Sequence, residues 1–302
     1  MLRCGVVLFL HFATDLLHSS IGGDCVFCGL RSVAPIVGYQ TITIPGYSGN
    51  KSGFALFTTT FKGVGQAGYS IKDIQVLDKN GNPFDGKTLT SVNKVTIQKI
   101  SGASTVVSDD TTYSFSTSGR SSMIGWHDMF QATKTLDASV TLANGEGVLV
   151  SNAQGEDVQL RFSGEVEIAP MSFAIPYVVG KSGFAIFGNF TPSPISIKDI
   201  KVLNKDKVEF DGKAATSVNK ITIQKIYGQN TVVSDDTTYS YSTSGRTTMI
   251  GWHDMFQATK TLDASVTLEP GEAVLVSNAQ GEPVYFQLKN PLTNTYAPIV
   301  AE

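Results

Sequence analysis

The chain has 302 residues, a net charge of −3 and 16% charged residues, without a block of either sign. This balance excludes the clustered positive surface that a nucleic-acid partner requires. The length allows two domains, and the abundance of Ser, Thr, Gly, Val and Ile favours strands over helices.

The first 31 residues differ from the rest and are expected to be a leader. Arg3 precedes an apolar run over 5–10, which is the order of a secretory signal, and the run is too short to span a bilayer. We expect export to the cell surface or medium and no membrane span in the mature chain. The three cysteines, Cys4, Cys25 and Cys28, lie in this leader. The pair Cys25 and Cys28 is interpreted as incidental rather than as a redox or metal pair, because no second C-x-x-C accompanies it.

Short alternating segments follow along the chain and predict strands. Their regular spacing, with an Asn-Gly turn signal at 80–81, is typical of a β-sandwich, jelly-roll or Ig-like, with a barrel as the alternative. Residues 129–136 are the one stretch expected to form a helical turn. The predicted strands of the first half are 37–44, 53–61, 71–78, 94–100, 105–108, 111–117, 138–142, 147–151 and 158–168.

An internal duplication organises the whole sequence. Residues 123–142 recur unchanged as 249–268, and residues 70–156 align without gaps on 196–282, with 69 of 87 positions identical. A four-residue deletion before Ser196 indicates a surface loop at 63–68 in the first copy. The chain is therefore predicted to be all-β, with two tandem β-sandwich domains. Repeat 1 covers 32–168, and repeat 2 covers 169–302.

The C-terminal tail resembles the start of a third repeat. Ala297, Pro298, Ile299 and Val300 repeat Ala34, Pro35, Ile36 and Val37, and Ala169-Pro170 stands at the start of repeat 2. Three interpretations stay open. The tail folds on its own domain, it docks on the next molecule to build a head-to-tail fibre, or it adds a strand to a neighbour's sheet.

Two polar motifs are weak candidates for chemistry. Gly-Trp-His-Asp occurs at 125–128 and 251–254, but one histidine per repeat, His127 and His253, is too few for a multi-histidine metal site. Asp78, Asn80 and Asn82 match half of a calcium loop, and the second copy loses a ligand. We therefore expect a hairpin turn, no catalytic residue and no cofactor, with weak surface Ca²⁺ left open.

Aromatic residues are the candidates for ligand contact. Tyr113 and Tyr239 lie on predicted strands, and Trp126 and Trp252 are the two tryptophans. Exposed rings of this kind would stack on sugars, whereas buried rings would be core. Asn189 begins a sequon for N-glycosylation.

Short motifs at both ends of repeat 1 carry a resemblance. V-G-Y-Q-T-I-T-I at 37–44, G-E-G-V-L-V at 145–150 and F-S-G-E-V at 162–166 resemble secreted β-sandwich surface proteins of planctomycete and verrucomicrobial type bacteria. Repeat 2 lacks the first motif. The resemblance implies export and a β fold, and it supplies no catalytic residues.

Two functions are predicted from these features. The first is a non-enzymatic structural subunit of an extracellular fibre or layer that self-assembles head to tail through 297–300 and 34–37. The alternative is a carbohydrate-binding or adhesive module with a polysaccharide partner, acting through Tyr113, Tyr239, Trp126 and Trp252.

Overall fold

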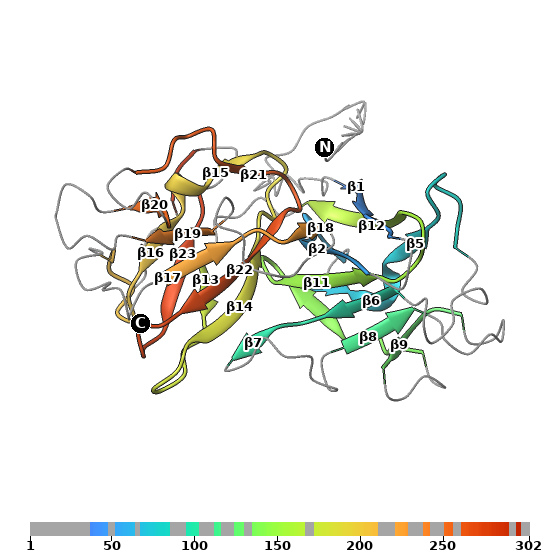
Figure 1. Ribbon diagram of the computed structural model, residues 1–302, viewed down its shortest axis with the longest axis horizontal. Helices are drawn as coiled ribbons and strands as arrows, with labels where there is room; N and C mark the ends of the chain where they lie inside the picture. The colour runs from blue at the N-terminus through green and yellow to red at the C-terminus, as the bar shows by residue number, and fades with distance from the viewer. Residues whose placement is uncertain are drawn as a thin grey trace, which may run out of the picture.

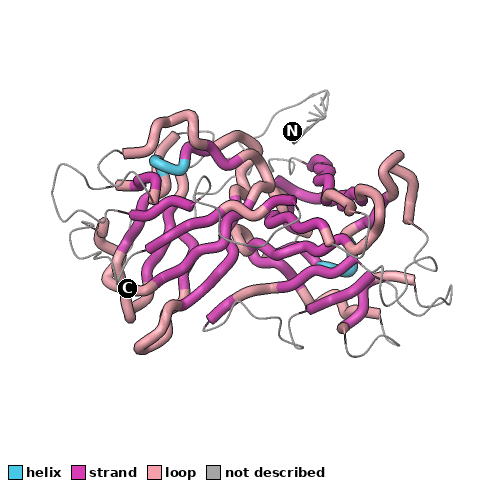
Figure 2. Tube along the Cα trace, in the orientation of Figure 1, coloured by secondary structure: helices cyan, strands magenta, loops and turns pink. Residues whose placement is uncertain are grey.

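The computed structural model describes residues 37–47, 52–63, 67–84, 95–102, 112–115, 124–129, 135–166, 172–210, 221–228, 238–241, 251–255, 261–289 and 294–296. Within these ranges the chain is all-β, as predicted, and consists of small antiparallel sheets with two one-turn 3-10 helices (Figures 1 and 2). No helix in the described ranges is long and apolar enough to cross a bilayer.

The strands of the first half agree closely with the alternating segments. They are β1 (Val37–Ile44), β2 (Gly53–Thr58), β3 (Phe61–Lys62), β4 (Gly68–Ser70), β5 (Gln75–Leu77), β6 (Val95–Gln98), β7 (Ser101–Gly102), β8 (Thr112–Phe115), β9 (Trp126–Asp128), β10 (Thr141–Ala143), β11 (Gly147–Asn152) and β12 (Val158–Val166). One prediction was wrong in part, because the segment 71–78 is a 3-10 turn, η1 (Ile71–Asp73), followed by β5. The turn buries both Ile71 and Ile74, which a straight strand would send to opposite faces.

The second half repeats these pairings. Its elements are β13 (Ser172–Ile175), β14 (Gly183–Gly188), β15 (Ile195–Ser196), η5 (Ile197–Asp199), β16 (Lys201–Leu203), β17 (Ile221–Gln224), β18 (Tyr227–Gly228), β19 (Thr238–Tyr241), β20 (Trp252–Asp254), β21 (Thr267–Leu268), β22 (Ala273–Asn278) and β23 (Val284–Gln287). The central strands keep their register. β11 pairs with β2 and β6, and β22 pairs with β14 and β17 in the corresponding way.

Each half encloses its own hydrophobic core. One buried cluster of the described residues contains side chains of repeat 1 alone, centred on Phe57, Trp126 and Phe162, and a second contains side chains of repeat 2 alone, centred on Phe187 and Trp252. In both, the buried side chains come from a six-stranded sheet and from a smaller sheet that contains β12 or β23. In alternating strands such as the first part of β12, every second side chain is buried.

Candidate functional site

The predicted assembly residues lie almost entirely outside the described ranges. This applies to Ala34, Pro35 and Ile36 at one end, and to Ala297, Pro298, Ile299 and Val300 at the other. Val37 begins β1 and pairs with Glu165 of β12.

The last described residues, 294–296, fold back onto repeat 2. The Tyr296 hydroxyl donates to the carbonyl of Asp199 at 2.6 Å, and the ammonium groups of Lys201 and Lys289 lie 4.6 and 5.5 Å from the ring centre. Burial, with the nearby carboxylates of Asp199 and Glu209, raises the pKa of Tyr296 to about 12. Tyr296 is therefore held at its own repeat.

The aromatic residues predicted to contact glycans are core residues. Tyr113, Tyr239, Trp126 and Trp252 are between 1% and 8% exposed. The indole nitrogens of the two tryptophans donate to carbonyls inside the fold, at Ile74 and Ile200. A buried ring offers no face to a sugar, so the glycan prediction is corrected for these four residues, and the core interpretation holds.

The repeated His-Asp pair lies at a strand beside the core. His127 and His253 are fully buried, and the His127 Nδ1 atom lies 2.8 Å from the carbonyl of Gly125. Among the described residues, no group of three or more His, Cys, Asp or Glu side chains is placed to hold a metal ion. Burial lowers the pKa of His253, and the carbonyl of Gly251 opposes this shift.

The lowered pKa of His253 makes the free energy of unfolding depend on pH. Between about pH 6.5, where an unfolded histidine titrates, and the lower pKa of the folded state, the unfolded chain binds more protons. Unfolding free energy should therefore fall as the pH falls below about 6.5, by at most about 1.4 kcal/mol per pH unit for this one group. Urea unfolding between pH 7.5 and 5.5 measures the slope, and His253→Asn should flatten it. An unchanged slope in the variant would assign the pH dependence to other groups.

The calcium-like motif forms a hairpin turn. Asp78 Oδ1 accepts the backbone N–H groups of Asn80 and Asn82 at 2.8 and 2.9 Å, and these bonds lower the pKa of Asp78. Asn204 Oδ1 accepts the equivalent pair of N–H groups in repeat 2, so an uncharged amide performs the same task. The geometry is that of a turn stabilised by a side chain.

The sequon at Asn189 is also internal. The Asn189 side chain is fully buried, and its Nδ2 atom donates to the carbonyls of Ser193 and Leu268 at 2.8 and 2.9 Å. Its Oδ1 atom accepts from Thr191. In this fold the amide is a structural connector and is not presented to a glycosylating enzyme.

The feature that sequence reasoning missed is the contact between the repeats, which we call the seam. β7 of repeat 1 pairs with β14 of repeat 2, and β18 of repeat 2 pairs with β2 of repeat 1 (Figure 1). β7 and β18 are equivalent strands, 126 residues apart in the sequence. β2 and β14 are also equivalent, because they pair in the same way with β11 and β22. Each repeat thus adds a short strand to the other's sheet, which is a reciprocal exchange.

Further backbone bonds repeat this symmetry. The N–H of Thr58 donates to the carbonyl of Gly271 at 2.9 Å, and the N–H of Gly188 donates to the carbonyl of Gly145 at 3.1 Å. The buried amide of Gln40 also crosses the seam and donates to the carbonyl of Pro270 at 2.7 Å. A hydrogen bond in such a buried position is costly to break, because the donor and the acceptor would then have neither each other nor water as a partner.

A third hydrophobic cluster of the described residues contains side chains from both repeats. Leu56 and Ile100 come from repeat 1, and Ile186, Ile226 and Ala273 come from repeat 2. All five are at most 9% exposed. The seam therefore combines ladder hydrogen bonds with a buried apolar centre.

Glycines at the centre of the seam break its symmetry. A Cβ atom at Gly188 would lie 2.3 Å from Cγ2 of Thr58, and one at Gly147 would lie 2.4 Å from Cγ2 of Ile186. The counterpart of Gly188 is Thr58, and that of Gly147 is Ala273. Each close approach thus sets a glycine of one repeat against a larger side chain of the other.

One end of the seam carries exposed tyrosine. Tyr227, on β18, is 52% exposed, and its pKa is raised by partial burial and by the nearby Asp157 and Tyr47. The Tyr47 hydroxyl lies beside Gly228, since a Cβ there would be 3.5 Å away. Asp157 accepts the backbone N–H of Gly46 at 2.9 Å. Because Ser101 is the counterpart of Tyr227, this cluster belongs to only one end of the seam.

No protein-family model, curated protein or solved structure matches the chain. The resemblance to bacterial surface proteins therefore stays a prediction.

Proposed function

We propose that this protein is a structural subunit of an extracellular fibre or layer, exported through its leader, in which two β-sandwich repeats act as one rigid block. The observation that carries the proposal is the reciprocal strand exchange at the seam. A subunit of a fibre carries load between its neighbours, so the junction between its two domains should be rigid. Paired strands and a shared apolar cluster provide that stiffness, whereas interfaces between freely moving domains are smaller and more polar.

The C-terminal tail supplies the joint in this proposal. Tyr296, the residue before 297–302 in the sequence, is held at Asp199. Their sequence repeats the residues that precede β1, and we propose that they take the equivalent position on the next subunit. A heterologous contact of this kind does not close on itself and builds an open filament.

Electron microscopy of protein beginning at Ser32 tests the assembly. We expect filaments from the intact chain and none after truncation behind Tyr296, which keeps the Tyr296 contacts and removes only 297–302. A second truncation behind Leu292 removes those contacts as well and should behave in the same way. Filaments that persist without 297–302 would exclude the tail as the joint, and monomers from the intact chain would overturn the proposal.

A carbohydrate-binding function is the second candidate, and the exposed cluster of Tyr227, Tyr47 and Asp157 favours it. An accessible ring can stack on a sugar, and a carboxylate beside it can accept hydrogen bonds from the sugar hydroxyl groups. Screening on a glycan panel should then give binding that Tyr227→Ala weakens about tenfold or more. Tyr177→Ala, at a tyrosine that is 44% exposed elsewhere, is the matched control. Equal binding by both variants and the parent would remove this candidate.

A further inference from the structure

The two ends of the seam differ in shape and in charge. Figure 1 shows β18 at one end and β7 at the other. At the β18 end Tyr227 is 52% exposed and lies beside Asp157. The counterparts of these two residues in the other repeat are Ser101 and Pro283. A Cβ atom at Gly102 of β7 would meet no atom within 4 Å. The β18 end therefore carries a projecting ring and an acid, whereas the surface of β7 is low and has neither.

An apolar hairpin loop lies beside the β7 end. It joins β13 to β14 and projects from repeat 2 at the lower edge of Figure 1. A Cβ atom at Gly183 would lie 2.7 Å from the Cα of Tyr177, and the next residue, Phe184, pairs with Gly102 of β7. Tyr177 is 44% exposed and Val179 is 83% exposed. The loop therefore adds an accessible apolar surface to this end of the seam.

The corresponding loop of repeat 1 has a different sequence. Residues 47–51 read Y-S-G-N-K, whereas residues 177–181 read Y-V-V-G-K. Repeat 2 thus has two valines where repeat 1 has serine and glycine. Packing within the chain does not account for Val179, because most of this side chain faces solvent. Neighbouring apolar side chains that are exposed in this way mark a contact with another molecule.

The charges of the two ends are opposite. Lys181 is exposed at the end of the hairpin loop, where its N–H donates to the carbonyl of Val178 at 3.1 Å. Asp157 is exposed at the β18 end and accepts the N–H of Gly46. Within the described ranges neither charge forms an ion pair. Opposite charges favour an encounter between two different surfaces, and like charges disfavour the pairing of one surface with itself.

We propose that the two ends of the seam bind each other in neighbouring molecules, so that the partner is a second copy of this protein. Tyr227 and Asp157 of one copy lie against the hairpin loop 177–181 of the next. The contact covers Tyr177, Val179 and Tyr227, which are three of the five large apolar side chains that are exposed in the described ranges. Because the two surfaces differ, the contact is heterologous and leaves one surface of each kind for a further copy.

This contact deepens the proposed fibre or layer, rests on that proposal for its role, and acts in addition to the tail. Few side chains take part in it. A single contact of this size is weak, so it holds no filament without the tail at the dilution used for electron microscopy.

Disulfide exchange between single-cysteine variants measures the contact. Protein that begins at Ser32 has no cysteine, and truncation behind Tyr296 removes the tail. Gly155→Cys lies two residues before Asp157, and a Cβ atom there meets no atom within 4 Å. Its mixed disulfide with thionitrobenzoate is combined with Val179→Cys at about 1 mM, where a weak contact is populated. The cysteine keeps a small apolar side chain at position 179, and the released thionitrobenzoate gives the rate.

Val208→Cys is the matched control, because Val208 is 59% exposed at the turn that follows β16. Each rate is divided by the rate of the same thiol with a small disulfide. The corrected rate of Val179→Cys should exceed that of Val208→Cys at least about tenfold. Equal corrected rates would overturn the proposal. A faster reaction of Gly155→Cys with its own activated form would overturn it as well, because like ends would then pair.

Reversal of the charges gives a second readout. Lys181→Asp in the Val179→Cys chain should slow the exchange about two- to fivefold, and Asp157→Lys in the activated chain should restore the rate. A rate that responds to neither change contradicts the proposed pairing of the two ends. Since these samples lack the tail, the two proposals fail separately. Filaments of the intact chain without specific exchange would leave the tail as the joint, and specific exchange without filaments would leave only this contact.

Discussion

Gly188→Thr is expected to lower the unfolding free energy by about 2–3 kcal/mol, a large effect for one substitution at a strand position. A Cβ atom added at position 188 would lie 2.5 Å from the Cβ of Thr58. The backbone of β2 holds the Thr58 Cβ in place. Neither side chain can rotate away from a clash between Cβ atoms. Urea unfolding of the variant and the parent gives the difference.

The matched control is Gly155→Thr, because a Cβ at Gly155 meets no atom within 4 Å. That variant should stay within about 0.5 kcal/mol of the parent. Equal losses at the two positions would mean that the cost comes from removing a glycine and not from the seam.

Exchange of the two residues provides a stricter test. Thr58→Gly alone should cost about 1 kcal/mol, because it removes the hydrogen bond from Thr58 Oγ1 to the carbonyl of Glu146. The double variant Thr58→Gly/Gly188→Thr again sets one threonine against one glycine, with the carbonyl of Glu272 in place of that of Glu146. The tight approach to Ala273, whose Cβ would lie 3.0 Å from a Cβ at position 188, is the part of the cost that stays. The double variant should therefore be more stable than the sum of the two single losses predicts, by at least about 1 kcal/mol.

This complementarity also decides which repeats pair. Two copies of repeat 1 would set threonine against threonine, and two copies of repeat 2 would set Ala273 where only Gly147 fits against Ile186. Repeat 1 is thus matched to repeat 2, although 69 of 87 aligned residues of the two are identical. Pairing of two copies of repeat 1, or of two copies of repeat 2, is therefore disfavoured at this surface.

The elements of the fold were largely predictable because alternation is a local signal. Val37 to Ile44 alternates and forms β1, and the copy of each strand in repeat 2 follows from the duplication. The exception at Ile71 has a simple reason. Ile71 and Ile74 stand three residues apart, a spacing that a short 3-10 turn places on one face and a strand places on opposite faces.

The seam was not predictable in the same way. The alternation of apolar residues predicts that Ile100 and Ile226 are buried, but it does not predict that they contact the opposite repeat. The signal for the seam in the sequence was in the positions at which the two repeats differ. Gly147 against Ala273 and Thr58 against Gly188 are places where the copies depart from each other, and such departures mark contacts that cannot be symmetric.

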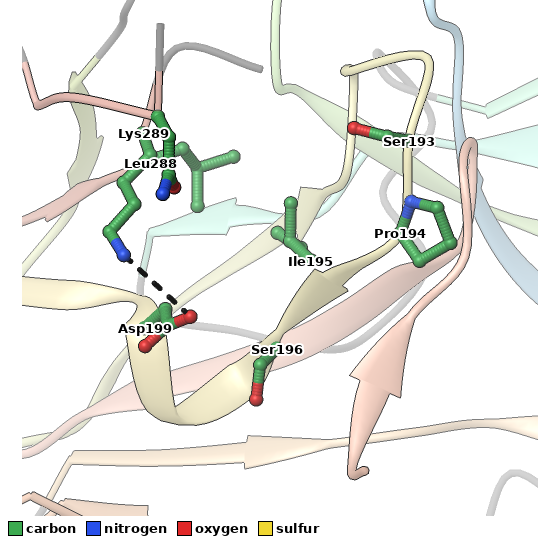
Figure 3. A pocket seen from close by; sticks show the side chains of 8 residues that line it. Ser193, Pro194, Ile195, Ser196, Asp199, Leu288 and Lys289 are labelled. Carbon is green, nitrogen blue, oxygen red and sulfur yellow. Dashed lines mark ion pairs between the residues drawn. The ribbon is translucent and has the colours of Figure 1, made fainter. Parts of the chain in front are cut away.

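A difference between the copies also marks the hollow beside η5 in repeat 2 (Figure 3). Tyr69 is buried, whereas its counterpart Ile195 is half-buried. The hydroxyl of Tyr296, far along the chain, donates to the carbonyl of Asp199, as that of Tyr69 donates to the carbonyl of Asp73. Only the three-dimensional arrangement shows that Leu288 and Asp199 meet at this position.

The seam also predicts how the repeats unfold, and Trp252→Ala tests this. Trp252 is 1% exposed, it donates to the carbonyl of Ile200 at 3.0 Å, and its ring packs against Tyr241 and Phe286. Its removal should cost about 3–5 kcal/mol. Tyr227→Ala, at an exposed ring, should change stability by less than about 0.5 kcal/mol and serves as the control.

The variant leaves Trp126 as the single tryptophan, so its fluorescence reports on repeat 1 alone. Because the exchanged strands and the apolar cluster join the two cores, loss of structure in repeat 2 should remove partners of β2 and expose Leu56. We therefore expect the fluorescence transition of Trp126 to move to lower urea together with the circular-dichroism transition of the whole chain. If Trp126 keeps the midpoint of the parent while half of the β signal is lost earlier, the repeats fold independently and the rigid-block proposal fails. Trp252→Phe, which keeps most of the ring volume, gives the same comparison if the alanine variant does not fold.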